Sequence, residues 1–298
     1  MAPRSDHCRR YRKGMQPEVT DIALRRCVFA VSVMHDVDLL PGDDGVELPG
    51  TPAVRVSWDE LRSAVGDHDP ATAEAQEQVR NWLARRRWIA DRPHAELREL
   101  VRPVGLPVGH SSHPGADWPR DRVLGDALDL GIGMVGLDPA HPDDVVVMPT
   151  PLLLGVGADP SLWWYDARRY LDRMAALAVT RWQRSPSEVI RPMGDCDVVT
   201  LVGSAAFRGA LCRESGGMRA IVVPMRIRGW VDLARIDPAF AIAAAAASEP
   251  AERGFERGLL ITADEVVMVQ PGGRPQEIVL RDPGMTRLQH TRPVLYHR

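Results

Sequence analysis

Residues 198–223 have the sequence VVTLVGSAAFRGALCRESGGMRAIVV, and this stretch decides the predicted fold. Its first five residues are apolar or β-branched, which predicts a buried strand. Residues 205–212 predict a helix that a glycine pair ends, and residues 220–223 predict a second strand. A strand, a helix and a strand in succession favour parallel pairing through a right-handed crossover. The stretch therefore predicts one unit of a parallel α/β sheet.

The residues that follow continue this alternation. Asp237 and Pro238 open a predicted helix that runs to Ala247 and is apolar on every side. Residues 259–262 and 266–269 predict two strands around a tight turn. We therefore expect an α/β protein with a mainly parallel sheet and covering helices in its C-terminal half. The apolar helix would lie between this sheet and either the N-terminal half or a second subunit.

The N-terminal part predicts strands with a helical insert. Residues 27–34 (CVFAVSVM) predict a buried strand, and residues 54–56 predict another. Ser57 and Glu60 fit a capping box, so a helix is expected to begin directly after Ser57. Helical segments are then expected as far as residue 102.

Three segments are expected along the chain. Residues 1–20 form a flexible basic tail, residues 21–110 hold the N-terminal strands and helices, and residues 111–298 form the α/β segment. The second and third segments either share one core or fold separately. Basic residues also surround Trp82 and Trp88, but six positions do not place two side chains on one helix face. Nucleic acid is therefore not the expected partner, because a run of charges is usually a solvated face.

The composition is that of an ordinary globular protein, with 298 residues, 45% of them hydrophobic, and a net charge of −3. Only one of the 37 basic residues is a lysine, Lys13, and its place in the tail excludes P-loop, protein-kinase and pyridoxal chemistry. Such scarcity of lysine is typical of a high-GC bacterial genome. The longest apolar run has nine residues, too few to span a membrane, and the four cysteines form no CxxC pair. We expect a cytoplasmic protein without membrane contact.

Residues 131–136 (GIGMVG) match the glycine spacing of a dinucleotide-binding loop. Such a loop needs a strand before it and a helix after it. Here a helix predicted over residues 120–130 comes first, and Pro139 and Pro142 follow. A glycine-rich buried turn or strand is the favoured interpretation, and no cofactor is expected.

Gly203 and Ser204 join the predicted strand to the predicted helix at the edge of a parallel sheet where ligands bind. Free N–H groups at the start of a helix attract anions. Arg226 and Arg228 leave the neighbouring predicted strand and would add positive charge. These four residues predict a site for a phosphate or a carboxylate. The alternative is a tight turn, a helix cap and surface ion pairs.

A loop predicted over residues 103–119 is long for a structureless connection, which is typical of a functional or mobile segment. It contains His110 and His113, and His141 follows with carboxylates close in sequence. Two histidines and a carboxylate can bind zinc and leave a position for water. The three histidines therefore predict a metal site. Polar loop residues are the favoured alternative, since no helical framework fixes the ligands.

The clearest helix of the sequence is expected over residues 161–184, after an Asp-Pro start. Trp163, Trp164 and Tyr165 cannot all face one core, so at least one of them is expected at an interface or in a pocket. The alternative is an aromatic ring that merely covers neighbouring apolar surface.

Two functions remain from these patterns. The favoured one is a non-catalytic binding or assembly protein, which joins itself or another protein through the helix 161–184 and holds an anionic ligand. The other is a hydrolase or transferase, with or without a metal, that uses residues 110–144. Cys196 lies between two aspartates, which disfavour a thiolate, so it predicts a core cysteine. The absence of a clear catalytic arrangement favours the binding protein.

Overall fold

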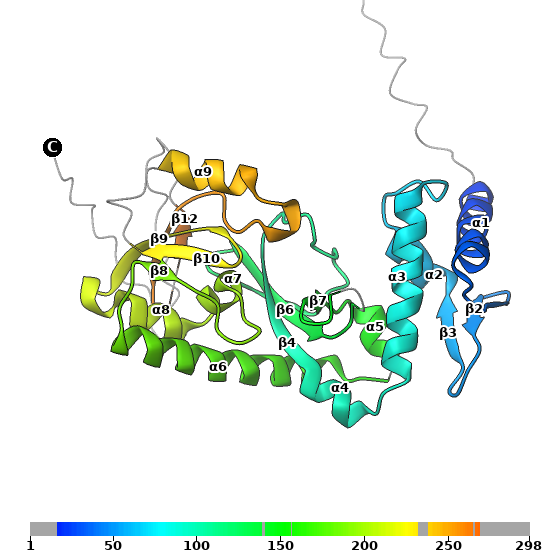
Figure 1. The fold of residues 1–298 in the computed structure, drawn as a ribbon, viewed down its shortest axis with the longest axis horizontal. Helices are drawn as coiled ribbons and strands as arrows, with labels where there is room; N and C mark the ends of the chain where they lie inside the picture. Colours follow the sequence, from blue (N-terminus) through cyan, green and yellow to red (C-terminus); the bar gives the residue numbers. More distant parts are fainter. Residues whose placement is uncertain (1–16, 139–140, 156, 232–237, 265, 269–298) are drawn as a thin grey trace, which may run out of the picture.

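The computed structural model describes residues 17–138, 141–155, 157–231, 238–264 and 266–268. Helices pack around three separate sheets (Figure 1). Every strand pair within the described residues is antiparallel. The prediction of a mainly parallel sheet in the C-terminal half is therefore wrong.

The error begins in the stretch that decided the prediction. Val198–Val202 forms a short helix, α7, in place of the predicted strand. The Asp197 carboxylate caps this helix by accepting a hydrogen bond from the Thr200 N–H at 2.7 Å. All five residues of α7 are buried, and a short buried apolar run has no period that separates a helix from a strand. Without that strand there is no parallel crossover.

The N-terminal elements form a helical unit with a small three-stranded sheet. These elements are α1 (Pro17–His35), β1 (Leu40–Pro41), β2 (Gly45–Leu48), β3 (Val54–Ser57), α2 (Trp58–Val65) and α3 (Ala73–Ala90). The strand predicted over residues 27–34 is wrong, because these residues belong to α1, which also includes residues 17–20 of the expected tail. Its buried side chains recur at helical spacing: Leu24, Cys27, Val28 and Val31. The Ser57 cap is confirmed, since its hydroxyl accepts the Glu60 N–H at 3.1 Å.

A short helix, α4 (His94–Leu100), leads into the central sheet. Its strands are β4 (Val101–Pro107), β5 (Arg120–Val123), β6 (Leu128–Val135) and β7 (Val145–Val147). Strand β6 lies in the middle and pairs with the other three. The prediction of a loop beginning at residue 103 is therefore wrong for residues 103–107, which belong to β4. The prediction of a helix over residues 120–130 is also wrong, because β5 and the start of β6 occupy that range.

The glycine-rich segment 131–136 lies mainly in β6, so of the two expected alternatives, a buried turn or a strand, the structure shows the strand. Its glycines leave room for neighbouring side chains. A Cβ at Gly131 would lie 2.5 Å from the indole of Trp118, and a Cβ at Gly133 would lie 2.3 Å from a methyl of Val104. Close approach across the sheet therefore accounts for the pattern.

We expect Gly131→Ala to lower the free energy of unfolding by about 1–3 kcal/mol, because the new methyl group would have to displace the buried indole of Trp118. Gly209→Ala is the matched control. A Cβ at Gly209 would meet only the Ala263 methyl at 3.5 Å, and alanine should raise the free energy of unfolding by about 0.5–1 kcal/mol inside a helix. Urea unfolding of both variants measures these changes in the free energy of unfolding. Equal effects of the two changes would contradict the packing argument.

The C-terminal elements form a five-stranded sheet in the order β12-β11-β9-β10-β8. They are α5 (Thr150–Leu154), α6 (Pro160–Arg184), β8 (Val189–Ile190), α7, α8 (Ala205–Cys212), η1 (Arg213–Ser215), β9 (Met218–Met225), β10 (Arg228–Val231), α9 (Pro238–Ala247), η3 (Pro250–Glu252), β11 (Leu259–Thr262) and β12 (Val266–Met268). Helix α6 confirms the predicted long helix, and the Asp159 carboxylate caps it. On α9, Ile242 is 51% exposed, so the N-terminal half does not enclose this apolar helix within one chain.

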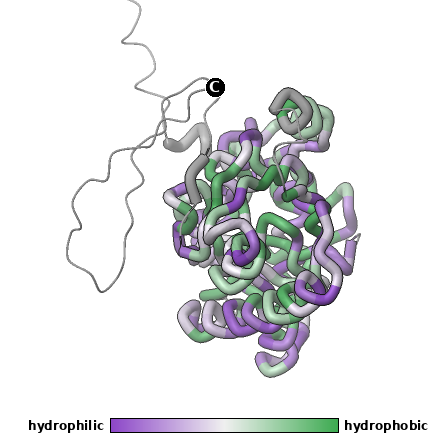
Figure 2. The backbone as a smooth tube through the Cα atoms, turned by 90° about the vertical axis from the view of Figure 1, so that its left-hand side faces the viewer, coloured by the Kyte–Doolittle hydropathy of each residue, from purple (hydrophilic) through white to green (hydrophobic). Residues whose placement is uncertain are grey.

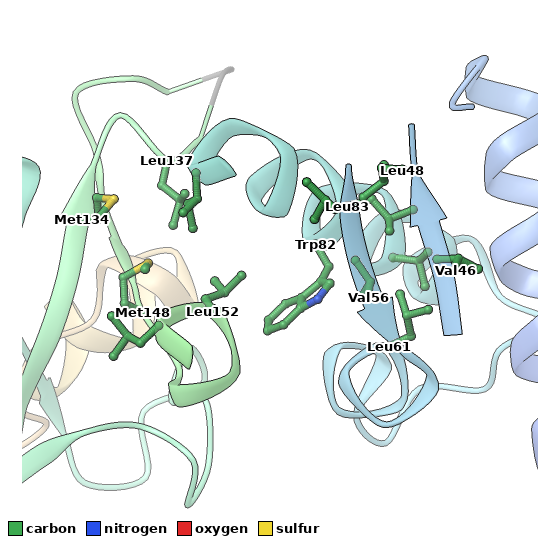
Figure 3. Packing of buried hydrophobic residues seen from close by; sticks show 14 of the residues in the cluster. Val46, Leu48, Val56, Leu61, Trp82, Leu83, Met134, Leu137, Met148 and Leu152 are labelled. Carbon is green, nitrogen blue, oxygen red and sulfur yellow. The ribbon is translucent and has the colours of Figure 1, made fainter. Parts of the chain in front are cut away.

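Two large clusters of buried side chains hold the fold together. The first joins the N-terminal unit to the central sheet, and Figure 3 shows Trp82 of α3 between Val56 and Leu61 on one side and Met148 and Leu152 on the other. It therefore crosses the boundary expected at residues 110 and 111. The second cluster lies between α6, α7, α8 and the C-terminal sheet.

Figure 2 shows the hydrophilic segments along the outside of the chain trace. In the described chain, no helix has the length and apolar character of a membrane span.

Candidate ligand-binding cleft

A cleft of about 860 Å³ lies where the three parts of the fold meet. The N-terminal unit contributes α3 side chains and residues 63–68, which form the last turn of α2 and the residues directly after it. The central sheet contributes β4, β7 and residues 111–117, which include part of the long loop predicted to be functional. The C-terminal part contributes residues from 192 to 200 and the hairpin turn at Arg226. Clefts at such junctions are common ligand sites.

The cleft has an apolar floor. Strand β4 places Pro103 and Val104 there, and β7 places Val145–Val147 beside them, because the two strands flank β6 in one sheet. Gly105 lets this floor lie against α7, since its N–H donates to the Thr200 hydroxyl at 2.8 Å. The floor is therefore fixed by both a sheet and a buried helix.

Carboxylates dominate the rest of the lining, with eight Asp or Glu side chains against two arginines. Arg226 already donates to Asp197 at 2.7 Å. Burial lowers the pKa of Arg85, and the nearby Asp138 carboxylate opposes that shift. Five exposed carboxylates, which we call the acidic rim, have no ion-pair partner among the described residues: Asp67, Asp117, Asp143, Asp144 and Glu252. The cleft therefore presents unbalanced negative charge around an apolar floor.

One wall of the cleft rests on a buried carboxylate, Asp129 of β6. His113 Nε2 lies 3.1 Å from this carboxylate, and Arg122 Nε donates to it at 3.0 Å. Arg120 Nε lies 3.3 Å away. Burial would raise the pKa of Asp129, but the hydrogen bonds from Arg122 and the charge of Arg120 hold that pKa below its usual value. His113 Nδ1 accepts the Gly115 N–H at 3.0 Å, so both ring nitrogens are used structurally.

We expect the protein to lose stability as the pH falls from about 7.5 to about 5. Burial, and then the charge of a nearby arginine, lowers the pKa of both His110 and His113 below the ordinary 6.5. Below pH 6.5 the unfolded chain therefore binds more protons than the folded chain. The stability contribution is complete above that pH and is lost as the pH falls through the lowered pKa values. Asp129 adds a loss at still lower pH, because its folded pKa is depressed.

Urea midpoints at the two pH values test this dependence. A His110→Gln/His113→Gln variant should show a smaller loss between them, because neither side chain then titrates. The same loss in the variant and in the parent protein would contradict these two histidines as its source.

The predicted metal ligands are not assembled into a centre. His110 Nδ1 accepts the Ser112 N–H at 3.1 Å, and His113 is bound to Asp129. His141 is exposed and lies 3.6 Å from Asp138. Within the ranges that the structure describes, no group of three or more His, Cys, Asp or Glu side chains has the geometry to hold a metal ion. Of the three histidines, only His113 lines the cleft.

The four residues predicted to bind an anion do not meet either. Arg226 contacts Asp197 before the first turn of α7, whereas Gly203 and Ser204 follow its last turn. The Ser204 hydroxyl accepts the Phe207 N–H and caps α8. Arg228 is exposed on β10, and of the four only Arg226 lines the cleft. The four residues lie apart because the parallel sheet edge that would have brought them together is not formed.

The three consecutive aromatic residues of α6 have three different environments. Trp163 is 1% exposed in the core, and Trp164 is half-buried and donates to Asp121 at 3.3 Å. Tyr165 is 59% exposed. Only Tyr165 is therefore open to a partner, and an interface at α6 stays a prediction.

Cys196 is buried, as predicted. Its burial, and to a smaller extent the charges of the flanking aspartates, raises the pKa of its thiol.

Sequence patterns pointed to the carboxylates at positions 117, 143 and 144 only as neighbours of histidines. Asp67 and Glu252 gave no signal, since Asp67 follows α2 and Glu252 ends η3, both far from these positions in sequence. No protein-family model matches the chain. The search of curated proteins and the search of solved structures also returned no match.

Proposed function

We propose that this protein is a non-catalytic binding protein that holds a basic peptide segment in the cleft. The observation that carries the proposal is the acidic rim around an apolar floor in a cleft of about 860 Å³. Carboxylates attract and orient arginine and lysine side chains, and the floor accommodates their aliphatic stems. An anionic ligand, which the sequence predicted, would meet a lining with eight carboxylates.

Binding is favoured over catalysis by the state of the reactive groups in the cleft. Both ring nitrogens of His113 are used in structural contacts. The Thr200 hydroxyl accepts the Gly105 N–H, and Asp197 is paired with Arg226. His113 and Thr200 are therefore not available as a base and a nucleophile, and the catalytic alternative based on residues 110–144 would have to use Ser111 or Ser112 with a rim carboxylate.

The proposal is tested with fluorescein-labelled hexa-arginine as the probe and hexaglutamate as its control, by fluorescence anisotropy. We expect hexa-arginine to bind with an affinity that falls as salt rises, and hexaglutamate not to bind. Asp143→Asn/Asp144→Asn should weaken binding by about fivefold, since exposed pairs contribute up to about 1 kcal/mol each.

A second variant separates the cleft from the overall charge. Asp172→Asn/Glu214→Gln changes net charge equally at two exposed positions outside the cleft. It should leave the affinity almost unchanged. Equal loss in both variants would show binding to diffuse negative charge and would contradict a site in the cleft.

We also propose a partner and a place of action for the protein. The partner is either a protein or a second copy, with Tyr165, Leu162 and Leu177 of α6 as exposed apolar contacts. The place of action is a bacterial cytoplasm, where the free thiols of Cys27, Cys196 and Cys212 would stay reduced. Native mass spectrometry against the chain mass of 32.9 kDa tests self-assembly. If α6 forms the interface, Tyr165→Glu should convert an oligomer to the monomer mass.

A further inference from the structure

The charge of the chain is distributed unevenly between its ends and its body. Residues 1–16 hold five basic side chains against the single acid Asp6, and residues 269–298 hold five arginines against two acids. Residues 17–268 therefore hold 27 arginines against 37 carboxylates. The body that forms the cleft is strongly acidic, whereas the segment that leads into α1 is basic.

The start of α1 contacts α2, the helix whose last turn lines the cleft. Asp21, in the second turn of α1, accepts a hydrogen bond from Arg62 of α2 at 2.5 Å. The residue after Arg62, Ser63, begins the stretch 63–68 that lines the cleft. Residues 9–13 lie four to eight residues before Pro17, so a fully extended chain carries them up to roughly 14–28 Å from the start of α1. By contrast, no described residue of β11 or β12, which precede residue 269, lines the cleft.

The composition of the segment fits the cleft. Residues 9–13 are RRYRK, so four basic residues flank Tyr11 in the sequence. The cations match the five unpaired carboxylates of the acidic rim, and Tyr11 matches the apolar floor of β4 and β7. The same cleft would therefore bind the chain's own basic segment by the chemistry proposed for its partner.

We propose that residues 1–16 dock on the acidic rim of the cleft in the same chain and compete there with a basic partner. This inference rests on the proposed function, because it names a second occupant of the same site. The segment would lower the apparent affinity for a partner by the fraction of molecules in which it occupies the cleft.

Carbodiimide cross-linking of the full-length protein tests the docking directly, because Lys13 provides the only lysine amine of the chain. The reagent joins an amine to a carboxylate without a spacer, so mass spectrometry of the linked peptides identifies the contact. We expect Lys13 to link to Asp67, Asp117, Asp143, Asp144 or Glu252, with a yield that falls at about 0.5 M salt. Lys13→Arg keeps the charge and should remove the links.

Two outcomes would overturn the docking. One is that Lys13 shows no preference for the rim, either because it forms no links there or because it links equally to exposed carboxylates elsewhere, such as Asp172 and Glu214. The other is hybrid links in a mixture of ¹⁴N- and ¹⁵N-labelled protein, which would place the segment on a second copy.

A competition experiment separates this inference from the proposed function. Arg9→Gln/Arg10→Gln/Arg12→Gln/Lys13→Gln should bind hexa-arginine at least about threefold more tightly than the parent chain. Equal affinities would overturn the docking and leave the binding function standing. If neither protein binds hexa-arginine while Lys13 still links to the rim, the proposed function fails and the docking stands.

Discussion

Trp163→Ala should lower the free energy of unfolding by about 3–5 kcal/mol, the range for removing a large aromatic side chain from a core. Trp163 is 1% exposed, and its ring and the ring of His94 pack in a T-shaped arrangement with a centroid distance of 6.5 Å. It belongs to the cluster that joins the N-terminal unit to the central sheet, so the cavity would open at that junction. Denaturant unfolding followed by circular dichroism measures the effect.

Tyr165→Ala, two residues along the same helix, is the matched control. Tyr165 is 59% exposed, so its removal should change the free energy of unfolding by less than about 0.5 kcal/mol. A loss of the same size in both variants would contradict the inward placement of Trp163 and the outward placement of Tyr165.

Asp129→Ala should destabilise the protein by about 3 kcal/mol. The change leaves His113, Arg120 and Arg122 without the carboxylate that they share. Breaking a buried ion pair typically costs about 3–5 kcal/mol, and the lower end applies because both arginines reach solvent. Thermal and urea unfolding measure the loss.

Asp172→Ala is the control for this change, since Asp172 is exposed on α6. It should leave stability within about 0.5 kcal/mol of the parent protein. Asp129→Asn should lie between the two, because the amide oxygen still accepts a hydrogen bond but carries no charge. If Asp129→Ala were as stable as Asp172→Ala, the carboxylate would not organise this wall of the cleft.

Helices with explicit start signals were predictable from the sequence. Ser57, Asp159 and Ser204 each place an oxygen before a helix, and each accepts a backbone N–H as that pattern predicts. Such signals act within one turn, so they do not depend on the rest of the fold. For residues 131–136 the flanking prolines excluded a cofactor loop and left a buried turn or a strand, of which the structure shows the strand.

The short apolar runs could not be assigned in the same way. Residues 27–34 and 198–202 are rich in β-branched and apolar side chains, yet both are helical. In both cases tertiary burial overrides a β propensity that is weak and dependent on context. Strand β4 was missed for the opposite reason, since its prolines and Gly105 are typical of a loop.

The cleft was beyond sequence analysis for a geometric reason. Its rim carboxylates lie in three separate connections and in η3, and only packing of the three parts of the fold brings them together. His113 and Arg226, two of the residues predicted to bind a ligand, are instead paired with Asp129 and Asp197. The antiparallel sheets therefore place the candidate site at a junction of elements, away from the predicted sheet edge.

Hydrogen–deuterium exchange of the protein with and without hexa-arginine locates the bound peptide. If the peptide binds in the cleft, exchange should slow in residues 63–68, 111–117, 143–147 and 251–252, which line the cleft, and should stay unchanged along α6 and α9. Slower exchange confined to other surfaces, or none at peptide concentrations that saturate the anisotropy signal, would contradict the cleft as the binding site.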